Sequence, residues 1–153
     1  MEAPNSWCFV KQYRFIADLL EAVEAPVPSS IQGHSFLSLL DGGIYKPRKE
    51  IFAEKTWHDS YDPIRCIRTK RYKFIHNFEP RPRLILPIDI ESSLTRLYMG
   101  DKHLEPRPTF ELYDLEEDPY ELNNLAKDQE YRMESKDMEK KTIWTYEKQV
   151  THF

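Results

Sequence analysis

The chain has 153 residues, of which 40% are hydrophobic, so it can build one modest domain with a core but not two full-sized ones. No apolar run approaches the roughly 20 residues that a membrane span needs, which excludes a membrane-spanning chain. The formal net charge is −4, and no predicted helix carries a basic face, so the composition also argues against binding to nucleic acid.

The charges are segregated along the chain. Residues 46–83 contain 11 Lys and Arg against 5 Asp and Glu, whereas residues 101–153 contain 8 against 14. Two interpretations remain open: the basic and acidic segments neutralise each other within one fold, or the basic segment forms a surface that attracts an anionic ligand.

The cysteines and the first residues give few functional signals. Cys8 and Cys66 are too few for a disulfide scaffold, and no Cys and His spacing is typical of structural zinc. Residues 1–10 lack the basic start and continuous apolar stretch of a secretory signal, so the sequence indicates no compartment.

The first part of the chain is predicted to be helical. Apolar residues recur at helical spacing and predict a helix over 10–24 that buries its stripe against something larger: Tyr13, Ile16, Leu19, Leu20 and Val23. Residues 35–40 predict a second, short helix, which Gly42 and Gly43 should end in a left-handed conformation.

The middle of the chain predicts strands. Residues 50–54 read as a strand that delivers the polar residues 54–59 to a loop at its end. Residues 64–68 and 72–77 are rich in β-branched and aromatic side chains and predict a hairpin around the connection 69–71.

The last part of the chain mixes loops, a strand and a helix. Prolines at 80, 82, 87, 106 and 108 predict extended or looped structure between them rather than helix. Residues 110–115 alternate as a strand, Asp118 should begin a helical turn, and residues 129–147 predict a last helix. The expected fold is α+β, a small antiparallel sheet backed by the C-terminal helix.

Three ordered blocks of this sequence resemble the C-terminal part of a type I sulfatase, closest to the N-sulfoglucosamine sulfohydrolase (heparan N-sulfatase) branch. They are VPSSIQGHSFLSLLDG (27–42), EIFAEKTWHDSYDPIRCIRTKRYKFIHNFEPRP (50–82) and FELYDLEEDPYELNNLA (110–126). The resemblance implies the C-terminal portion of an alkaline-phosphatase-like α/β fold. Residues 1–48 would then be a remnant of the large domain, and residues 49–153 the C-terminal subdomain.

The same resemblance implies hydrolysis of a sulfuric ester or a sulfamate in the complete enzyme. Such enzymes use a formylglycine made from Cys-x-Pro/Ala-x-Arg, together with Ca²⁺. Neither Cys8 nor Cys66 has that sequence after it, and the family's calcium ligands have no counterpart here. We therefore expect no cofactor and no catalytic residue in this chain, which should be inactive alone, as a gene fragment, a splice form or one piece of a split enzyme. Complete relatives are lysosomal, secreted or periplasmic.

The resemblance also implies residues that face the substrate. Glu54, His58 and Asp59 match the family loop that approaches the sulfated sugar, and Arg65 on the next strand joins this set. A solvated loop is the alternative, because acids and a histidine without a nucleophile or metal are weak evidence for chemistry.

A second functional hypothesis is a non-catalytic module that binds a sulfated glycan or a protein through a basic hairpin. Arg68 and Arg71 are the candidate anion-binding residues. The alternative is a solvated ribbon whose charges pair with the acidic residues 114–121. The expected partners are the missing sulfatase catalytic domain, a second copy of the chain, or sulfated carbohydrate.

One departure from the family concerns folding. Glu24 stands where relatives commonly have Gly after the first helix. Because a left-handed cap costs a Glu energy that Gly avoids, the residues around it are expected to be locally rearranged.

Overall fold

The computed structural model describes residues 15–29, 31, 33–45, 47–58 and 60–150. The chain divides into two compact units, residues 1–49 and residues 50–153. Each unit is described by itself below.

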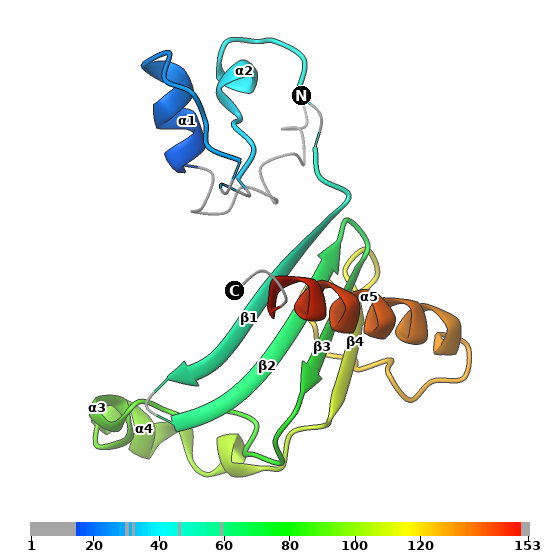
Figure 1. Ribbon diagram of the computed structural model, residues 1–153. Helices are drawn as coiled ribbons and strands as arrows, with labels where there is room; N and C mark the ends of the chain where they lie inside the picture. Colours follow the sequence, from blue (N-terminus) through cyan, green and yellow to red (C-terminus); the bar gives the residue numbers. More distant parts are fainter. Residues whose placement is uncertain (1–14, 30, 32, 46, 59, 151–153) are drawn as a thin grey trace. The chain divides into compact units, whose positions relative to one another are not determined.

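The second unit contains a four-stranded antiparallel sheet. Its strands are β1 (Glu50–His58), β2 (Ser60–Thr69), β3 (Tyr72–Asn77) and β4 (Phe110–Asp114), and they lie side by side in chain order (Figure 1). The hairpin predicted between 64–68 and 72–77 is confirmed, with Lys70 and Arg71 at its turn. The hydroxyl of Thr69 closes this turn, since it accepts a hydrogen bond from the backbone N–H of Tyr72 at 2.9 Å.

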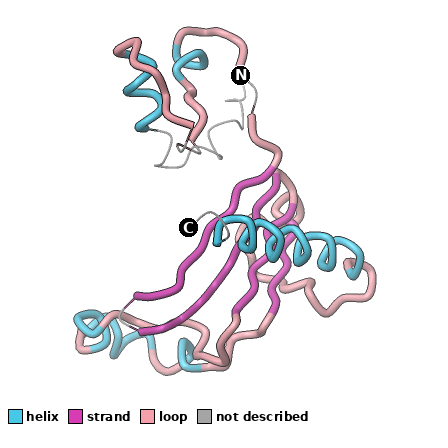
Figure 2. The backbone as a smooth tube through the Cα atoms, in the orientation of Figure 1, coloured by secondary structure: helices cyan, strands magenta, loops and turns pink. Residues whose placement is uncertain are grey.

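The hydrophobic core lies between the sheet and the C-terminal helix α5 (Arg132–Val150), which crosses one face of the sheet (Figure 2). Ile67, Phe74 and Leu112 stand opposite one another on neighbouring strands, and each is fully buried. Met138 of α5 packs on this row. Burying a side chain of this size stabilises a fold by about 1.5–3 kcal/mol, so the row holds the helix against the sheet.

Helix α5 confirms the predicted last helix, and few of the apolar side chains in this region are buried. Met138 is buried and Tyr131 packs at the edge of the core, whereas Met133 and Trp144 are 76% and 57% exposed. Thr142 is buried instead, and its hydroxyl donates to the carbonyl of Met138 at 2.8 Å. That bond satisfies the hydroxyl within the helix and allows a polar residue to lie against the sheet.

The loop predicted after residue 54 is wrong, because β1 continues to His58. Residues 54–58 pair with β2 across a shift in register between Lys55 and Trp57. The extra residue lies on β2, next to Pro63, which has no N–H to offer the ladder. Cross-strand pairing therefore overrides the polar composition of this segment.

The prediction of extended or looped structure between the prolines is also wrong in part. The segment contains α3 (Ile88–Glu91), α4 (Leu94–Met99) and a 3₁₀ turn, η3 (Lys102–Leu104). Pro87 directly precedes α3, where its missing N–H costs nothing. Ser93 caps α4, since its hydroxyl accepts the N–H of Arg96 at 3.2 Å.

The predicted helical turn at Asp118 is a non-helical turn. The N–H of Glu121 donates to the carbonyl of Asp118, and the φ angle of Glu121 is 57°, which ends any helical path. The Asp118 carboxylate accepts the N–H of Asn123 at 2.7 Å, so it closes the turn rather than beginning a helix.

The first unit contains α1 (Phe15–Ala22) and α2 (Leu37–Leu40). Residues 10–14 of the predicted helix lie outside the described residues. The carboxylate of Asp18 accepts the N–H of Phe36 at 2.7 Å and joins the two helices. Ile16, Leu19 and Val23 of the predicted stripe are more than half exposed. Gly42 adopts φ 73°, as predicted for the stop after α2.

The local rearrangement expected around Glu24 is wrong, because Glu24 itself adopts the left-handed cap conformation. Its φ angle is 56°, and the N–H groups of Glu24 and Ala25 donate to the carbonyls of Glu21 and Leu20. These two bonds form a Schellman cap, in which the left-handed position favours Gly.

No helix within the described residues is long and apolar enough to cross a membrane.

Candidate functional site

The described part of the candidate site is the β1–β2 hairpin, where Glu54 and Arg65 are cross-strand partners. The side chain of Glu54 is 56% exposed, and its carboxylate lies 3.4 Å from Nε of Arg65, whose side chain is 9% exposed. The pair therefore presents a carboxylate to solvent beside a buried guanidinium. An exposed carboxylate in this position can accept hydrogen bonds from sugar hydroxyls.

Several groups of β1, β2 and α5 contact the guanidinium of Arg65. Its Nη1 donates to the carbonyls of Lys55 at 2.8 Å and Ile64 at 3.0 Å, and its Nη2 donates to the hydroxyl of Thr56 at 3.0 Å. The guanidinium also lies 4.4 Å from the ring centroid of Tyr146 on α5. These contacts make Arg65 a link between β1, β2 and α5, and its role toward substrate stays a prediction.

His58 and Asp59 cannot be positioned in the same way. The backbone of His58 belongs to β1, but the side chain of His58 and the whole of Asp59 lie outside the described residues. The predicted contact of these two residues with a sulfated sugar stays a prediction.

A buried charge cluster lies near the turn of the β1–β2 hairpin, and sequence reasoning missed it. Asp62 is 1% exposed and pairs with both Lys55 and Arg107. Arg107, whose side chain is 5% exposed, also donates to the carbonyl of Glu79 at 3.2 Å. Burial alone would raise the pKa of the Asp62 carboxyl, but the hydrogen bonds and charges of Arg107 and Lys55 outweigh it, so this pKa lies below its ordinary value.

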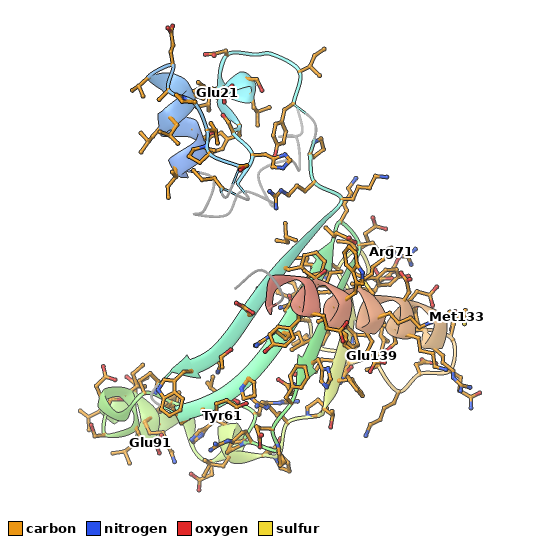
Figure 3. All side chains as sticks on the ribbon, in the orientation of Figure 1. Glu21, Tyr61, Arg71, Glu91, Met133 and Glu139 are labelled. Carbon is orange, nitrogen blue, oxygen red and sulfur yellow. The ribbon has the colours of Figure 1, made fainter. Side chains whose placement is uncertain are left out.

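Two exposed aromatic side chains were also missed. Trp57 and Tyr61 are direct partners across the hairpin, and their ring centroids lie 6.4 Å apart with a 54° angle between the rings. Tyr61 is labelled on the hairpin in Figure 3. The only available signal was two large aromatic residues inside a polar segment.

Arg71, one of the two candidate anion-binding residues, is already paired. Its Nε and Nη2 donate to the same Asp114 oxygen at 2.9 and 2.8 Å, and Asp114 is 1% exposed. These hydrogen bonds from Arg71, acting against burial, hold the pKa of the Asp114 carboxyl below its ordinary value and raise the pKa of Arg71. An anion at Arg71 would have to displace a buried carboxylate.

Arg68, the other candidate, stands opposite Lys73 on β3. The ammonium of Lys73 pairs with Glu121 at 2.5 Å. Together with the Arg71–Asp114 pair, this contact shows that Arg71 and Lys73 pair with the acidic residues 114–121. Binding of an anion by Arg68 stays a prediction.

The described histidines of this unit pack within it. His76 stacks on Phe78 with ring centroids 3.8 Å apart, and it contacts Phe110 at 4.6 Å. Burial lowers the pKa of His76, although the Glu139 carboxylate acts in the opposite direction. His103 is buried, and its Nδ1 lies 3.1 Å from the carbonyl of Gly100.

The described residues do not fit the family's nucleophile or metal. Cys66 lies in the middle of β2, between Ala53 and Ile75 on the neighbouring strands, and Ile-Arg-Thr-Lys follows it. The described ranges contain no group of three or more His, Cys, Asp or Glu that could hold a metal ion.

No family model matches the chain. It is 32% identical over 135 residues to an ulvan-active sulfatase of Formosa agariphila, a match that covers 77% of this chain and 22% of the relative. It is similar in structure to a protein solved in complex with its substrate D-glucosamine-2-N,6-O-disulfate, with a TM-score of 0.60, 22% identity, and coverage of 88% of this chain and 23% of that one. A 2-O GAG sulfatase gives a TM-score of 0.55 and 23% identity, with coverage of 90% and 24%.

These comparisons show the fold. The sheet and helix α5 are those of the C-terminal part of an alkaline-phosphatase-like sulfatase, as predicted. The chain spans less than a quarter of the length of the curated relative that it matches.

Proposed function

We propose that residues 50–153 serve as the C-terminal subdomain of a sulfatase that hydrolyses a sulfuric ester or a sulfamate of a carbohydrate. The observation that carries the proposal is the match to a sulfatase in sequence over 77% of the chain, together with the shared sheet and helix. In this proposal the first unit belongs to the large α/β domain.

The proposed contribution of this chain is to bind the sugar. In this proposal Glu54 accepts sugar hydroxyls, and His58 and Asp59 contact the sulfated group. The exposed carboxylate of Glu54 and the buried ion pairs of Asp62 near the hairpin turn support this assignment. The nucleophile and Ca²⁺ are supplied by residues outside this sequence, so the chain alone should turn over no substrate.

Within the sulfatases, we assign the chain to the N-sulfoglucosamine sulfohydrolase branch. The block over 50–82 supports this assignment, and so does similarity to a protein whose substrate carries an N-sulfate. A preference for N-sulfated over O-sulfated glucosamine in the complete enzyme would test it.

A chimera tests the proposed function. The matched C-terminal part of the ulvan-active sulfatase is replaced by this chain, and turnover of a chromogenic sulfate ester is measured with Ca²⁺. We expect turnover by the chimera and none by the chain alone. His58→Ala should lower kcat/KM of the chimera by about 100-fold, whereas Glu117→Gln, an exposed acid of the 115–118 turn, should not. A folded chimera without turnover, or turnover by the chain alone, would contradict the proposal.

A further inference from the structure

Trp57 and Tyr61 form an exposed aromatic pair on the hairpin. Trp57 is 69% exposed and Tyr61 is 47% exposed, although each ring faces the other across the two strands. With centroids 6.4 Å apart and planes tilted by 54°, the rings form an open wedge rather than a closed stack. Each ring therefore keeps a face available to a ligand.

Ion pairs and hydrogen bonds hold the backbone that carries this aromatic pair. Asp62, next to Tyr61, is held by Lys55 and Arg107, and the guanidinium of Arg81 donates to the carbonyl of Tyr61 at 2.9 Å. The N–H of Phe78 donates to the carbonyl of Pro63 at 3.1 Å. Rigid aromatic side chains on a fixed backbone bind with a small loss of conformational entropy.

Three cationic side chains lie near the aromatic pair. Lys55 and Arg107 share the single carboxylate of Asp62, and the ammonium-bearing side chain of Lys55 is 40% exposed. Arg81 adds another cation next to Tyr61. These three cations attract the sulfate groups of a ligand, while Glu54 is an exposed carboxylate on the same hairpin.

We propose that Trp57 and Tyr61 hold a sugar ring of the sulfated carbohydrate, with the C–H face of the ring against the indole. This inference rests on the proposed function and adds to it a stacking contact that determines substrate specificity.

Binding to the full 153-residue chain tests the inference without turnover. Trp7→Phe and Trp144→Phe leave Trp57 as the single tryptophan, and its fluorescence is followed during titration with a heparin-derived tetrasaccharide. The desulfated tetrasaccharide and inorganic sulfate are titrated in parallel. We expect saturable change with the sulfated sugar, a weaker response with the desulfated one, and none with inorganic sulfate.

The variants are measured by calorimetry in the otherwise unchanged chain. Trp57→Ala and Tyr61→Ala should each weaken binding of the sulfated tetrasaccharide by about fivefold or more. Tyr61→Phe should retain binding, because the ring rather than the hydroxyl makes the contact. Tyr120→Ala removes an aromatic ring that is 82% exposed elsewhere and should change nothing. Circular dichroism verifies that each variant is folded.

Several outcomes would overturn the inference. These are unchanged affinity of folded Trp57→Ala, absence of binding to any probe, and a full fluorescence response to inorganic sulfate. An inactive chimera contradicts the proposed function but leaves these binding results standing, so the two failures are distinguishable.

Discussion

Asp62 and Arg107 are 45 residues apart in the sequence and form an ion pair whose side chains are 1% and 5% exposed. The pair connects β2 to the residues just before β4, while Lys55 adds a contact from β1. Two charges removed from water are stable only when both are well paired. This cluster therefore fixes the hairpin that carries the proposed sugar-binding residues.

Asp62→Asn should lower the free energy of unfolding by about 3 kcal/mol, because it leaves the buried guanidinium of Arg107 without its counter-charge. Urea denaturation at pH 7 measures the change. Glu91→Gln is the control, since it removes a carboxylate that pairs with Arg96 while half exposed, and its effect should be much smaller. Equal effects of the two variants would contradict the structural role of Asp62.

Replacing His76 should reduce the pH dependence of stability. Burial lowers the pKa of His76 from its ordinary 6.5 in the folded chain, so the unfolded chain binds more protons between the two values. The free energy of unfolding is therefore unaffected by His76 above pH 6.5. It decreases as the pH falls from 6.5 through the lowered pKa that His76 has in the folded chain. His76→Gln should show a smaller loss of stability than the wild type between pH 7.5 and pH 5, as measured by urea denaturation at both pH values.

The same experiment can also contradict the role of His76. The depressed pKa values of the Asp62 and Asp114 carboxyls act only near and below pH 3.8, so they do not contribute in this range. An equal loss in wild type and His76→Gln would show that another group titrates.

Arg71→Gln should destabilise the chain at neutral pH, and its difference from wild type should shrink in acid. The ionised Asp114 carboxylate gains from Arg71 above pH 3.8, and that gain is lost as the pH falls through the lowered pKa of Asp114. Urea denaturation at pH 7 and pH 3 measures both differences. A difference that is equal at the two pH values would contradict the pairing.

The same variant distinguishes the non-catalytic alternative. Retention on a heparin column should fall equally for Arg71→Gln and for Arg132→Gln, an exposed Arg at the start of α5. A selective loss with Arg71→Gln would favour an anion site at the β2–β3 turn.

The sequence predicted the elements whose signals are local. Alternating β-branched and aromatic residues identify β2, β3 and β4, and the antiparallel hairpin follows from the short connection at 69–71. Glu24 was identified as a strained position, but the expected rearrangement is absent, because two backbone hydrogen bonds of the cap hold Glu24 in the left-handed conformation.

Features that depend on distant partners could not be predicted. The polar residues after Glu54 read as a loop, and they form a strand because β2 supplies hydrogen-bonding partners. No local sequence pattern indicates that Asp62 pairs with Arg107. Pro87 precedes a helix, but its position among the other prolines of 80–108 favoured a loop. In the candidate site, the resemblance supplied Glu54, whereas Trp57 and Tyr61 emerge from their pairing and exposure.

Glu24→Gly should stabilise the first unit by about 1 kcal/mol, because Gly adopts the left-handed conformation without the steric cost of a Cβ. Hydrogen exchange measures this directly: the amides of Glu24 and Ala25 close the cap, so their protection should rise about fivefold.

Glu21→Gly is the matched control, because it places glycine inside α1 and should lower protection by a similar factor. Glu121 also has a positive φ of 57°, but its carboxylate pairs with Lys73, so Glu121→Gly exchanges relief of backbone strain for a lost ion pair and should gain less. Equal protection in wild type and Glu24→Gly would mean that the residues around the cap already relieve the strain.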